Sequence, residues 1–489
     1  MKNEIKRKII SILVVTTVLG SISYLMATAK KRQYKQANMN KSPVILSKSR
    51  LYVDFDRDGA YQPFFIKGVC YNPMPIGRYP FDSGYKVRID ERPNNIFNDE
   101  EILRRDFDLL KKMNCNTIRI WKANKIYKLG KRRRKRKNRY YPNFLTKKTL
   151  DLAEEYGLKV IPGFWINTLE PKCKNWEKIF NHPDFTDEEI REDLLEEFKG
   201  FVTQFKNHPA ILFWAIGNEN NYHFDHSNFE EIKSFYSLIN EMAKAAHDIE
   251  GPKMYHPVTF INGDIHEIGD LSYGTTDQQI PHLDAWGINA YRGESFGDLF
   301  KEYAKKTKKA IWISEFGVDV FHAFNPKYTE VGKPEEKIQA EWLSSLWNDL
   351  IDNRNSVLGG CVMEYSDEWW KPDGTFKDGK YNFTHEPFGL GPQDRDCDGL
   401  LDWTPPAPDK FFHLEWFGIM KIKNFGEARD EMWPREAYYT LKDHFLCDPL
   451  HKPFFAGERN NKSCDDSYAC CADPSGKSEA WKCVTECSP

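Results

Sequence analysis

The sequence predicts an α/β protein whose main body is a closed (β/α)8 barrel. Two observations lead to this fold class: short apolar runs alternate with longer amphipathic stretches, and the alternation yields eight strands over about 300 residues. Repeated strand–helix units form a parallel sheet. The alternative, an open doubly wound sheet, is less favoured because no Gly-x-Gly-x-x-Gly loop follows the first strand.

The strands are expected where four to six apolar residues follow one another. They are residues 64–69, 117–121, 159–164, 211–216, 257–261, 285–289, 310–313 and 359–363. The helices between them are expected at residues 99–113, 145–156, 187–205, 229–247, 296–305 and 335–351. In the first helix Ile102, Phe107 and Leu110 recur at helical spacing, and Gly157 stops the second helix. With extensions, the barrel takes up residues 51–446.

Composition excludes several classes of protein. Hydrophobic residues make up 40% and charged residues 29% of the 489 residues, which excludes a wholly disordered chain and a polytopic membrane protein. Lys and Arg number 70 against 72 Asp and Glu, and a net charge of -2 gives no support to nucleic-acid binding. The aromatic share of 14% requires a large core or an aromatic-lined cleft.

The N-terminus predicts a membrane-targeting segment over residues 1–29. A basic start precedes residues 9–29, which carry no charge and are about long enough to cross a bilayer. The segment is either a cleaved signal peptide, ending at Ala27-Thr28-Ala29, or a signal-anchor helix that contacts the membrane. Both place the body in the secretory pathway, outside the cell or at its surface, after a linker at residues 30–50.

The C-terminus predicts a Cys-rich tail over residues 447–489. Six of the eleven cysteines lie there: Cys447, Cys464, Cys470, Cys471, Cys483 and Cys487. Disulfides are expected because the segment is too poor in apolar residues to form a core. Zinc is the alternative, but only His451 lies among these cysteines and no Cys-x-x-Cys pair occurs. The odd count leaves a free thiol in the barrel region, and Asn40, Asn382 and Asn461 begin glycan sequons.

Polar and aromatic side chains stand at the C-terminal ends of the predicted strands, where a barrel places its active site. Glu219 ends the fourth strand and Glu315 ends the seventh. A carboxylate that follows a buried run is costly unless it is paired or used. The other candidates are Arg119, Trp121, Trp165, Asn218, Tyr291, Trp369 and Trp370. Two carboxyl groups among aromatic residues indicate glycoside hydrolysis.

A resemblance makes this chemistry more specific. The segment NHPAILFWAIGNE, residues 207–219, is similar to the acid/base signature of clan A glycoside hydrolases, and WISEFG, residues 312–317, is similar to their nucleophile strand. GINAY, residues 287–291, resembles the strand that supplies a tyrosine. Barrels of families 2 and 5 are the nearest matches. The family 72 β-1,3-glucanosyltransferases share the first strand, a secretory signal and a Cys-rich end. Family 2 enzymes carry β-sandwich domains before the barrel, so the clan is expected and the family is left open.

The resemblance implies a (β/α)8 barrel, retaining chemistry and a role for each candidate. Glu219 would be the acid/base and Glu315 the nucleophile. Asn218 would hydrogen-bond the sugar 2-hydroxyl, Tyr291 would donate to the nucleophile, and Arg119 would keep it ionised. Sugar stacking is expected from aromatic residues at the strand ends: Trp121, Trp165, Trp369 and Trp370.

Two further motifs have competing readings. Residues 131–139 contain eight basic residues in nine, and a solvated barrel loop is favoured over a nucleic-acid patch, a contact with anionic polysaccharide or a proteolytic site. Asp394, Asp396, Asp398 and Asp402 resemble the ligands of a calcium loop, but Pro405 stands where such a loop needs a glutamate. A structural calcium or an acidic turn is therefore expected there, and catalysis needs no cofactor.

The predicted function is a retaining β-glycosidase that cleaves a β-linked polysaccharide or oligosaccharide of glucan or mannan type. One alternative is a transglycosylase that remodels a wall or matrix with the same site. Another class is a carbohydrate-binding surface protein without catalysis, and a third is an interaction protein that uses the Cys-rich tail. Neither nucleic acid nor a metal is an expected partner of the reaction.

Overall fold

The computed structural model describes twelve segments of the chain: residues 42–55, 57–75, 95–124, 144–168, 183–251, 254–323, 332–368, 407–409, 413–423, 430–446, 469–472 and 481–484. Several predicted features lie outside these residues. They are the signal or anchor segment, the basic run at 131–139, the calcium loop, the three sequons, and Trp369 with Trp370. Of the predicted tail, the structure describes only two short strands.

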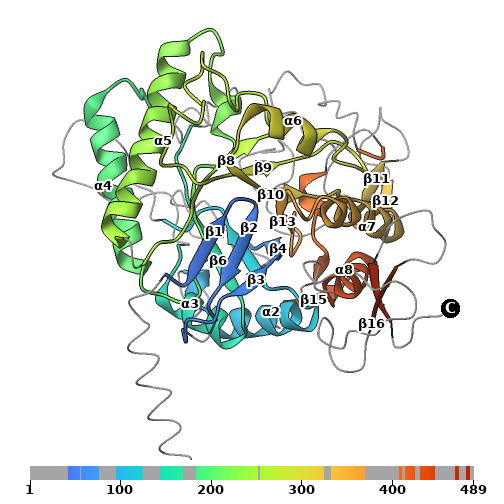
Figure 1. Cartoon of the computed structure of the whole chain (residues 1–489). Helices are drawn as coiled ribbons and strands as arrows, with labels where there is room; N and C mark the ends of the chain where they lie inside the picture. Colours follow the sequence, from blue (N-terminus) through green and yellow to red (C-terminus); the bar gives the residue numbers. More distant parts are fainter. Residues whose placement is uncertain are drawn as a thin grey trace, which may run out of the picture.

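A closed ring of eight parallel strands confirms the predicted fold class (Figure 1). The ring order is β10-β13-β4-β5-β6-β7-β8-β9. The strands are β4 (Ile66–Cys70), β5 (Thr117–Ile120), β6 (Lys159–Phe164), β7 (Trp214–Ile216), β8 (Val258–Gly263), β9 (Ala285–Asn289), β10 (Ala310–Phe316) and β13 (Val357–Val362). Each coincides with or overlaps a strand expected from the sequence.

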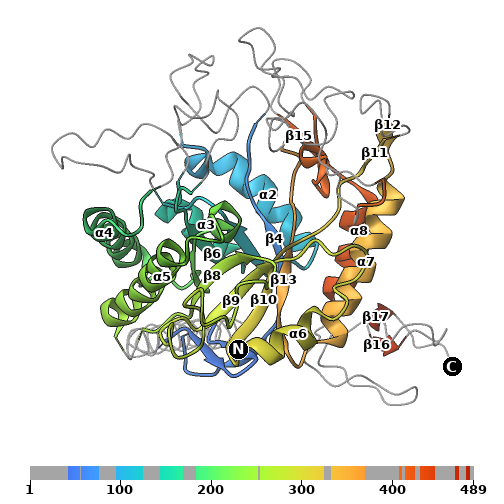
Figure 2. The same cartoon turned by 90° about the horizontal axis from the view of Figure 1, so that it is seen from above.

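Helices surround the ring, as Figure 2 shows. They are α2 (Glu100–Lys112), α3 (Lys147–Glu155), α4 (Glu188–Phe205), α5 (Phe229–Glu250), α6 (Leu299–Lys306), α7 (Glu336–Asp352) and α8 (Glu436–Leu446). All but α8 were expected. Four begin at a side chain that accepts a hydrogen bond from a first-turn N–H: Asp99, Thr146, Asp187 and Asn228. These caps explain why each of the four helices begins at the residue that follows its cap.

The strands separate two apolar layers. Alternate residues face the helices, and the others fill the barrel, where Phe213, Ile261 and Trp312 belong to one buried cluster. Across this interior Trp312 Nε1 donates to Thr259 Oγ1 at 3.1 Å. Gly287 leaves room for this packing, because a Cβ there would lie 2.5 Å from the Ile261 Cδ1 atom. The interior is therefore a packed core and not a pore.

An antiparallel sheet that the sequence did not predict packs onto the interior cluster. It consists of β1 (Val44–Ser47), β2 (Arg50–Val53) and β3 (Gln62–Phe64). Val44, Leu51 and Val53 are buried in the same cluster as the barrel interior. The run expected as one strand, 64–69, is divided at Phe65 between β3 and β4.

Smaller elements complete the described chain. Three antiparallel hairpins pair β11 (Phe321–Ala323) with β12 (Gly332–Pro334), β14 (Met420–Lys423) with β15 (Glu431–Pro434), and β16 (Ala469–Ala472) with β17 (Trp481–Val484). The 3-10 turns are η1 (Ile96–Asn98), η2 (Asn220–His223) and η3 (Leu414–Trp416). Cys70, Cys115 and Cys361 are free and buried, as expected of a barrel thiol. Among the described helices, none is both long and apolar enough to cross a membrane.

Candidate active site

The C-terminal ends of neighbouring strands form the mouth of the barrel. Strand register places Gly263 of β8 beside Asn289 of β9, and Asn289 beside Glu315 of β10. These three residues form one row across the mouth. Glu219 follows β7, which is the next strand beyond β8. The two glutamates predicted from the sequence therefore stand at the same end of the barrel, on strands three positions apart in the ring.

Three donors hold the carboxyl group of Glu315, whose residue is only 5% exposed. Arg119 Nη1 donates to Oε1 at 2.7 Å, and the indole N–H of Trp121 donates to the same oxygen. Tyr291 donates its hydroxyl to Oε2 at 2.9 Å. Each oxygen is thus engaged, and the carboxyl group cannot turn without breaking a hydrogen bond to a buried or half-buried partner.

Arg119 also joins Glu315 to Asn218. Its Nη2 donates to Asn218 Oδ1 at 2.5 Å, and Asn289 Nδ2 donates to the same oxygen at 3.3 Å. Asn289 in turn accepts from Ser314 Oγ at 2.7 Å. Since the amide oxygen of Asn218 is engaged, its Nδ2 is the end that can donate to a ligand.

Tyr291 stays protonated over the working pH range of most enzymes. Burial, followed by the nearby charges of Glu315 and Glu219, raises the pKa of Tyr291 well above 10. The phenol therefore acts as a hydrogen-bond donor and not as a base. The influence of Glu219 on this pKa also shows that Glu219 lies within electrostatic range of Tyr291.

Glu219 is presented by a tight turn rather than by a strand. Its φ of 52° is left-handed, and Gly217 before it has a φ of 63°. A left-handed conformation costs a residue with a Cβ about 1 kcal/mol and persists only where the surroundings impose it. The backbone N–H of Glu219 donates to the Ile261 carbonyl at 3.0 Å, which ties the turn to β8.

Two buried asparagines that the sequence analysis missed fix this turn. Asn220 Oδ1 accepts from the Asn218 N–H at 3.0 Å, and its Nδ2 donates to the Ile166 carbonyl at 3.0 Å and to Thr168 Oγ1 at 2.6 Å. A Cβ at Gly217 would lie 2.2 Å from Asn220 Oδ1, so the turn needs glycine there.

Asn221 fastens the other side of the turn. Its Oδ1 accepts from the Gly263 N–H at 2.8 Å, and its Nδ2 donates to the Gly263 carbonyl at 2.9 Å. The same Nδ2 reaches Glu267 Oε2 at 3.1 Å. Asn220 thus holds η2 to the segment after β6 and Asn221 holds it to β8. The run Asn-Glu-Asn-Asn at 218–221 was the only signal in the sequence for these residues.

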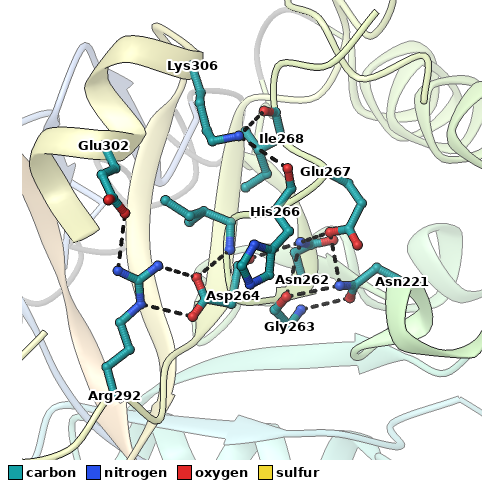
Figure 3. A network of polar contacts seen from close by, with 11 residues as sticks. Asn221, Asn262, Gly263, Asp264, His266, Glu267, Ile268, Arg292, Glu302 and Lys306 are labelled. Carbon is teal, nitrogen blue, oxygen red and sulfur yellow. Dashed lines mark hydrogen bonds and ion pairs between the residues drawn. The ribbon is translucent and has the colours of Figure 1, made fainter. Parts of the chain in front are cut away.

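The end of β8 carries a polar network that was not among the predicted site residues (Figure 3). Arg292, which directly follows Tyr291, donates from Nε and Nη2 to the two oxygens of Asp264. Its Nη1 reaches Glu302 Oε2 at 3.3 Å. Asp264 has a left-handed φ of 53° and its N–H donates to the Asn289 carbonyl at 3.0 Å. The network fastens the loop after β8 to the segment that carries Tyr291.

The end of β13 adds acidic groups to the mouth. Glu364 and Glu368 are buried, and Glu368 Oε1 accepts from Asn72 Nδ2 at 3.1 Å. Between them, Asp367 forms a bidentate ion pair with Arg435 at 2.6 and 2.8 Å. Arg435 lies between β15 and α8, so the pair anchors the β14–β15 hairpin and α8 to the barrel.

The predicted stacking residues divide into three groups. Trp121 directs its indole N–H at Glu315. Trp165 is half-buried after β6, with Lys122 Nζ 4.4 Å from its ring centroid. Trp369 and Trp370 lie outside the described residues, as do the four aspartates of the calcium loop. Within the described segments no group of three or more acidic, His or Cys side chains is arranged to hold a metal.

Comparison with known proteins identifies relatives of this barrel. β-Glucuronidase from Mus musculus is 23% identical over 282 residues, which are 55% of this chain and 34% of that protein. β-Galactosidase from Lactococcus lactis is 23% identical over 306 residues, which are 60% of this chain and 23% of that protein. The chain thus spans about a third or less of these relatives' length.

Solved structures give similar matches. A β-D-glucuronidase from Dictyoglomus thermophilum has a TM-score of 0.47 at 15% identity, over 82% of this chain and 53% of that one. A β-galacturonidase from Eisenbergiella tayi has a TM-score of 0.45 at 16% identity, over 82% and 53%.

The family follows from a direct match to a family model. Residues 134–398, more than half of the chain, match the model of the glycosyl hydrolases family 2, TIM barrel domain. The sequence resemblance extended to families 5 and 72 as well, and the match decides between the three. Through its barrel, this chain belongs to glycosyl hydrolase family 2.

Proposed function

We propose that the chain is a retaining β-glycosidase in which Glu315 is the nucleophile and Glu219 the acid/base. The observation that carries the proposal is the set of three donors on Glu315, from Arg119, Trp121 and Tyr291. A carboxyl group held by three fixed donors, one of them a guanidinium, is suited to attack the anomeric carbon. Glu219 is more exposed, on a turn at the same mouth, where a leaving group can reach it.

The proposed reaction is a double displacement. Glu219 gives its proton to the glycosidic oxygen while a Glu315 oxygen attacks the anomeric carbon, so the leaving group departs and a glycosyl-enzyme forms. Glu219 then takes a proton from water, the water attacks the same carbon, and Glu315 is released. Asn218 Nδ2 would donate to the sugar 2-hydroxyl and strengthen that bond in the transition state.

We propose an uncharged sugar as the preferred substrate. Apart from the ion pairs Arg292–Asp264 and Arg435–Asp367, the described mouth holds the carboxyl groups of Glu219, Glu315, Glu364 and Glu368 against the cations Arg119 and Lys122. Arg119 is already paired with Glu315. This excess of acidic groups disfavours a sugar that carries a carboxylate of its own. A glucoside, mannoside or galactoside therefore fits better than the glucuronide that some relatives are named for.

A substrate panel tests both parts of the proposal. The wild-type enzyme is given 4-nitrophenyl β-glucoside, β-mannoside, β-galactoside and β-glucuronide, and then β-linked oligosaccharides of the preferred sugar. We expect turnover of a neutral glycoside with a β-configured product, and loss of turnover in Glu219→Gln and Glu315→Gln. Preference for the glucuronide would refute the neutral sugar alone. Unchanged activity in both variants would refute the mechanism.

A further inference from the structure

We propose that Tyr222 forms an aromatic platform for the sugar ring on the leaving-group side of the bond that is cleaved. This inference rests on the proposed function and adds a binding subsite to it. Tyr222 lies in η2, three residues after Glu219, and is 52% exposed. Separate observations show where the ring lies, which hydrogen bonds hold its main chain, and that the ring is half exposed.

The ring of Tyr222 occupies the space in the barrel mouth that a side chain at position 263 would fill. Thr259 and Ile261 of β8 face the interior, where they contact or pack with Trp312. Residues two apart on a strand face the same side, so position 263 faces the interior as well. A Cβ at Gly263 would lie 2.1 and 2.4 Å from two ring carbons of Tyr222. The phenol ring therefore fills the inward position at the end of β8.

This position belongs to the row of residues that contains the nucleophile. Gly263 pairs in register with Asn289, and Asn289 pairs with Glu315. Tyr222 thus lies at about the same height along the barrel axis as Glu315, next to β7 and β8. Glu219 follows β7, so the ring stands on the flank of the mouth that carries the acid/base.

Hydrogen bonds at Tyr222 and at its neighbour Asn221 hold the main chain that carries the ring. The Tyr222 N–H donates to the Glu219 carbonyl at 3.1 Å. The preceding residue, Asn221, binds both the N–H and the carbonyl of Gly263, a contact drawn in Figure 3. A ring supported in this way loses little freedom when a ligand packs on it, which favours binding.

The chemistry of the reaction defines what the platform would bind. The leaving group must pass next to Glu219, because that residue protonates the glycosidic oxygen. A β-linked pyranose has an apolar face of C–H groups that packs on an aromatic ring, while its hydroxyls stay in water. A half-exposed tyrosine beside the acid/base therefore fits the next sugar of a β-linked oligosaccharide, either as leaving group or as acceptor.

Two substrates of the same sugar separate this role from a structural one. A β-glycosyl fluoride has no ring in its leaving group, whereas a β-linked disaccharide has one. We expect Tyr222→Ala to lower kcat/KM for the disaccharide by about tenfold, which corresponds to about 1.4 kcal/mol for the lost aromatic contact, and to leave the fluoride within about twofold. Tyr222→Phe keeps the ring and should match the wild type. Equal losses on both substrates, or no loss on the disaccharide, would overturn the proposal.

Gly263 provides a matched second variant. Its φ is not left-handed, so alanine fits its backbone, yet the added Cβ would displace the Tyr222 ring. Gly263→Ala should therefore show the same selective loss, and should add no loss to Tyr222→Ala. Additive losses would contradict the contact. Tyr439→Ala, at an equally exposed tyrosine on α8, is the control and should change neither substrate.

Binding without turnover keeps this inference separate from the proposed function. Calorimetric titration with β-linked oligosaccharides is carried out on the wild type and on Tyr222→Ala. If neither protein cleaves any substrate but Tyr222→Ala binds oligosaccharide about tenfold more weakly, the proposed function is wrong and the platform stands. Equal binding by both proteins would refute the platform itself.

Discussion

The two carboxyl groups of the site are positioned in different ways. Glu315 lies on the barrel strand β10, is buried, and accepts hydrogen bonds on both of its oxygens. Glu219 is more exposed and sits in a left-handed turn, which Asn220 and Asn221 fix through the backbone of its neighbours. One residue is held by contacts to its side chain, and the other by the geometry of its main chain.

This difference corresponds to the different tasks we propose. A nucleophile keeps one charge state before attack and gains from fixed donors that stabilise it. An acid/base gives up a proton and takes one back in every cycle, so a permanent cation beside it would hold it in one state. Placement of Glu219 through its backbone suits this task.

Removal of either carboxyl group should have the largest effect on turnover, and the products should distinguish the nucleophile from the acid/base. We expect Glu315→Ala and Glu219→Ala to lower kcat by about 10³-fold or more on a disaccharide, since each removes a reacting group. Kinetics on the preferred substrate of the panel measure both losses.

Added azide identifies which of the two carboxyl groups has been removed. In Glu315→Ala azide enters from the nucleophile's face and should give an α-glycosyl azide. In Glu219→Ala it attacks the glycosyl-enzyme from the opposite face and should give the β-azide. Proton NMR of the products reads the configuration, and an exchange of the two outcomes would reverse the assignment of the residues.

On the nucleophile side, Tyr291→Phe tests a single donor. Loss of the hydrogen bond to Glu315 Oε2 should lower kcat by about 10²-fold, as for other donors to charge in a buried site. The pKa of Tyr291 lies well above 10, so the phenol does not titrate between pH 5 and 9. The shape of the pH–rate profile should therefore be the same in the variant. Loss of an alkaline limb would show that Tyr291 is a titrating group after all.

On the acid/base side, Asn220→Ala tests the support of the turn. It leaves the Asn218 N–H and the Ile166 carbonyl without their buried partner, so we expect about 1–3 kcal/mol of destabilisation and about a tenfold loss in kcat. Asn228→Ala, which removes the cap of α5, is the matched control: it should cost about 1 kcal/mol and leave kcat unchanged. A loss of stability with normal kcat in Asn220→Ala would show that the turn does not depend on this side chain.

The sequence was sufficient for the parts of the molecule that depend on local pattern. Buried parallel strands give continuous apolar runs, which located all eight barrel strands, and residues that end such strands are brought together by the fold itself. Glu219, Glu315, Arg119, Asn218 and Tyr291 were found in this way, although their roles remain a proposal.

What the sequence did not reveal depends on contacts between distant segments. Nothing local predicts that Asn221 binds Gly263, or that the Tyr222 ring fills the space above that glycine. The hairpin formed by β1 and β2 was missed because its strands are only four residues long. The secretory segment, the glycans, the tail disulfides and the calcium loop remain predictions from sequence alone.

The smallest expected effect concerns Asp319, a second buried carboxyl group on the segment that follows β10. Unlike Glu315, it has no arginine partner in the described part of the chain: its Oδ2 accepts from the His413 N–H at 3.2 Å, and its Oδ1 has no partner there. Burial raises the pKa of Asp319 to about 7. The folded state therefore keeps a proton that the unfolded chain has lost above pH 4, and stability falls as pH rises from about 4 to about 7.

Asp319→Asn removes this titration while keeping the size of the side chain. Between pH 5 and pH 8 the variant should gain roughly 1–3 kcal/mol relative to the wild type, because only the wild type must bury a charge or keep a proton at the higher pH. Urea unfolding at the two pH values measures the difference, and turnover should be little changed. A difference that does not depend on pH would mean that Asp319 is stabilised as an anion. The contrast between Glu315 on β10 and Asp319 on the segment after it would then disappear.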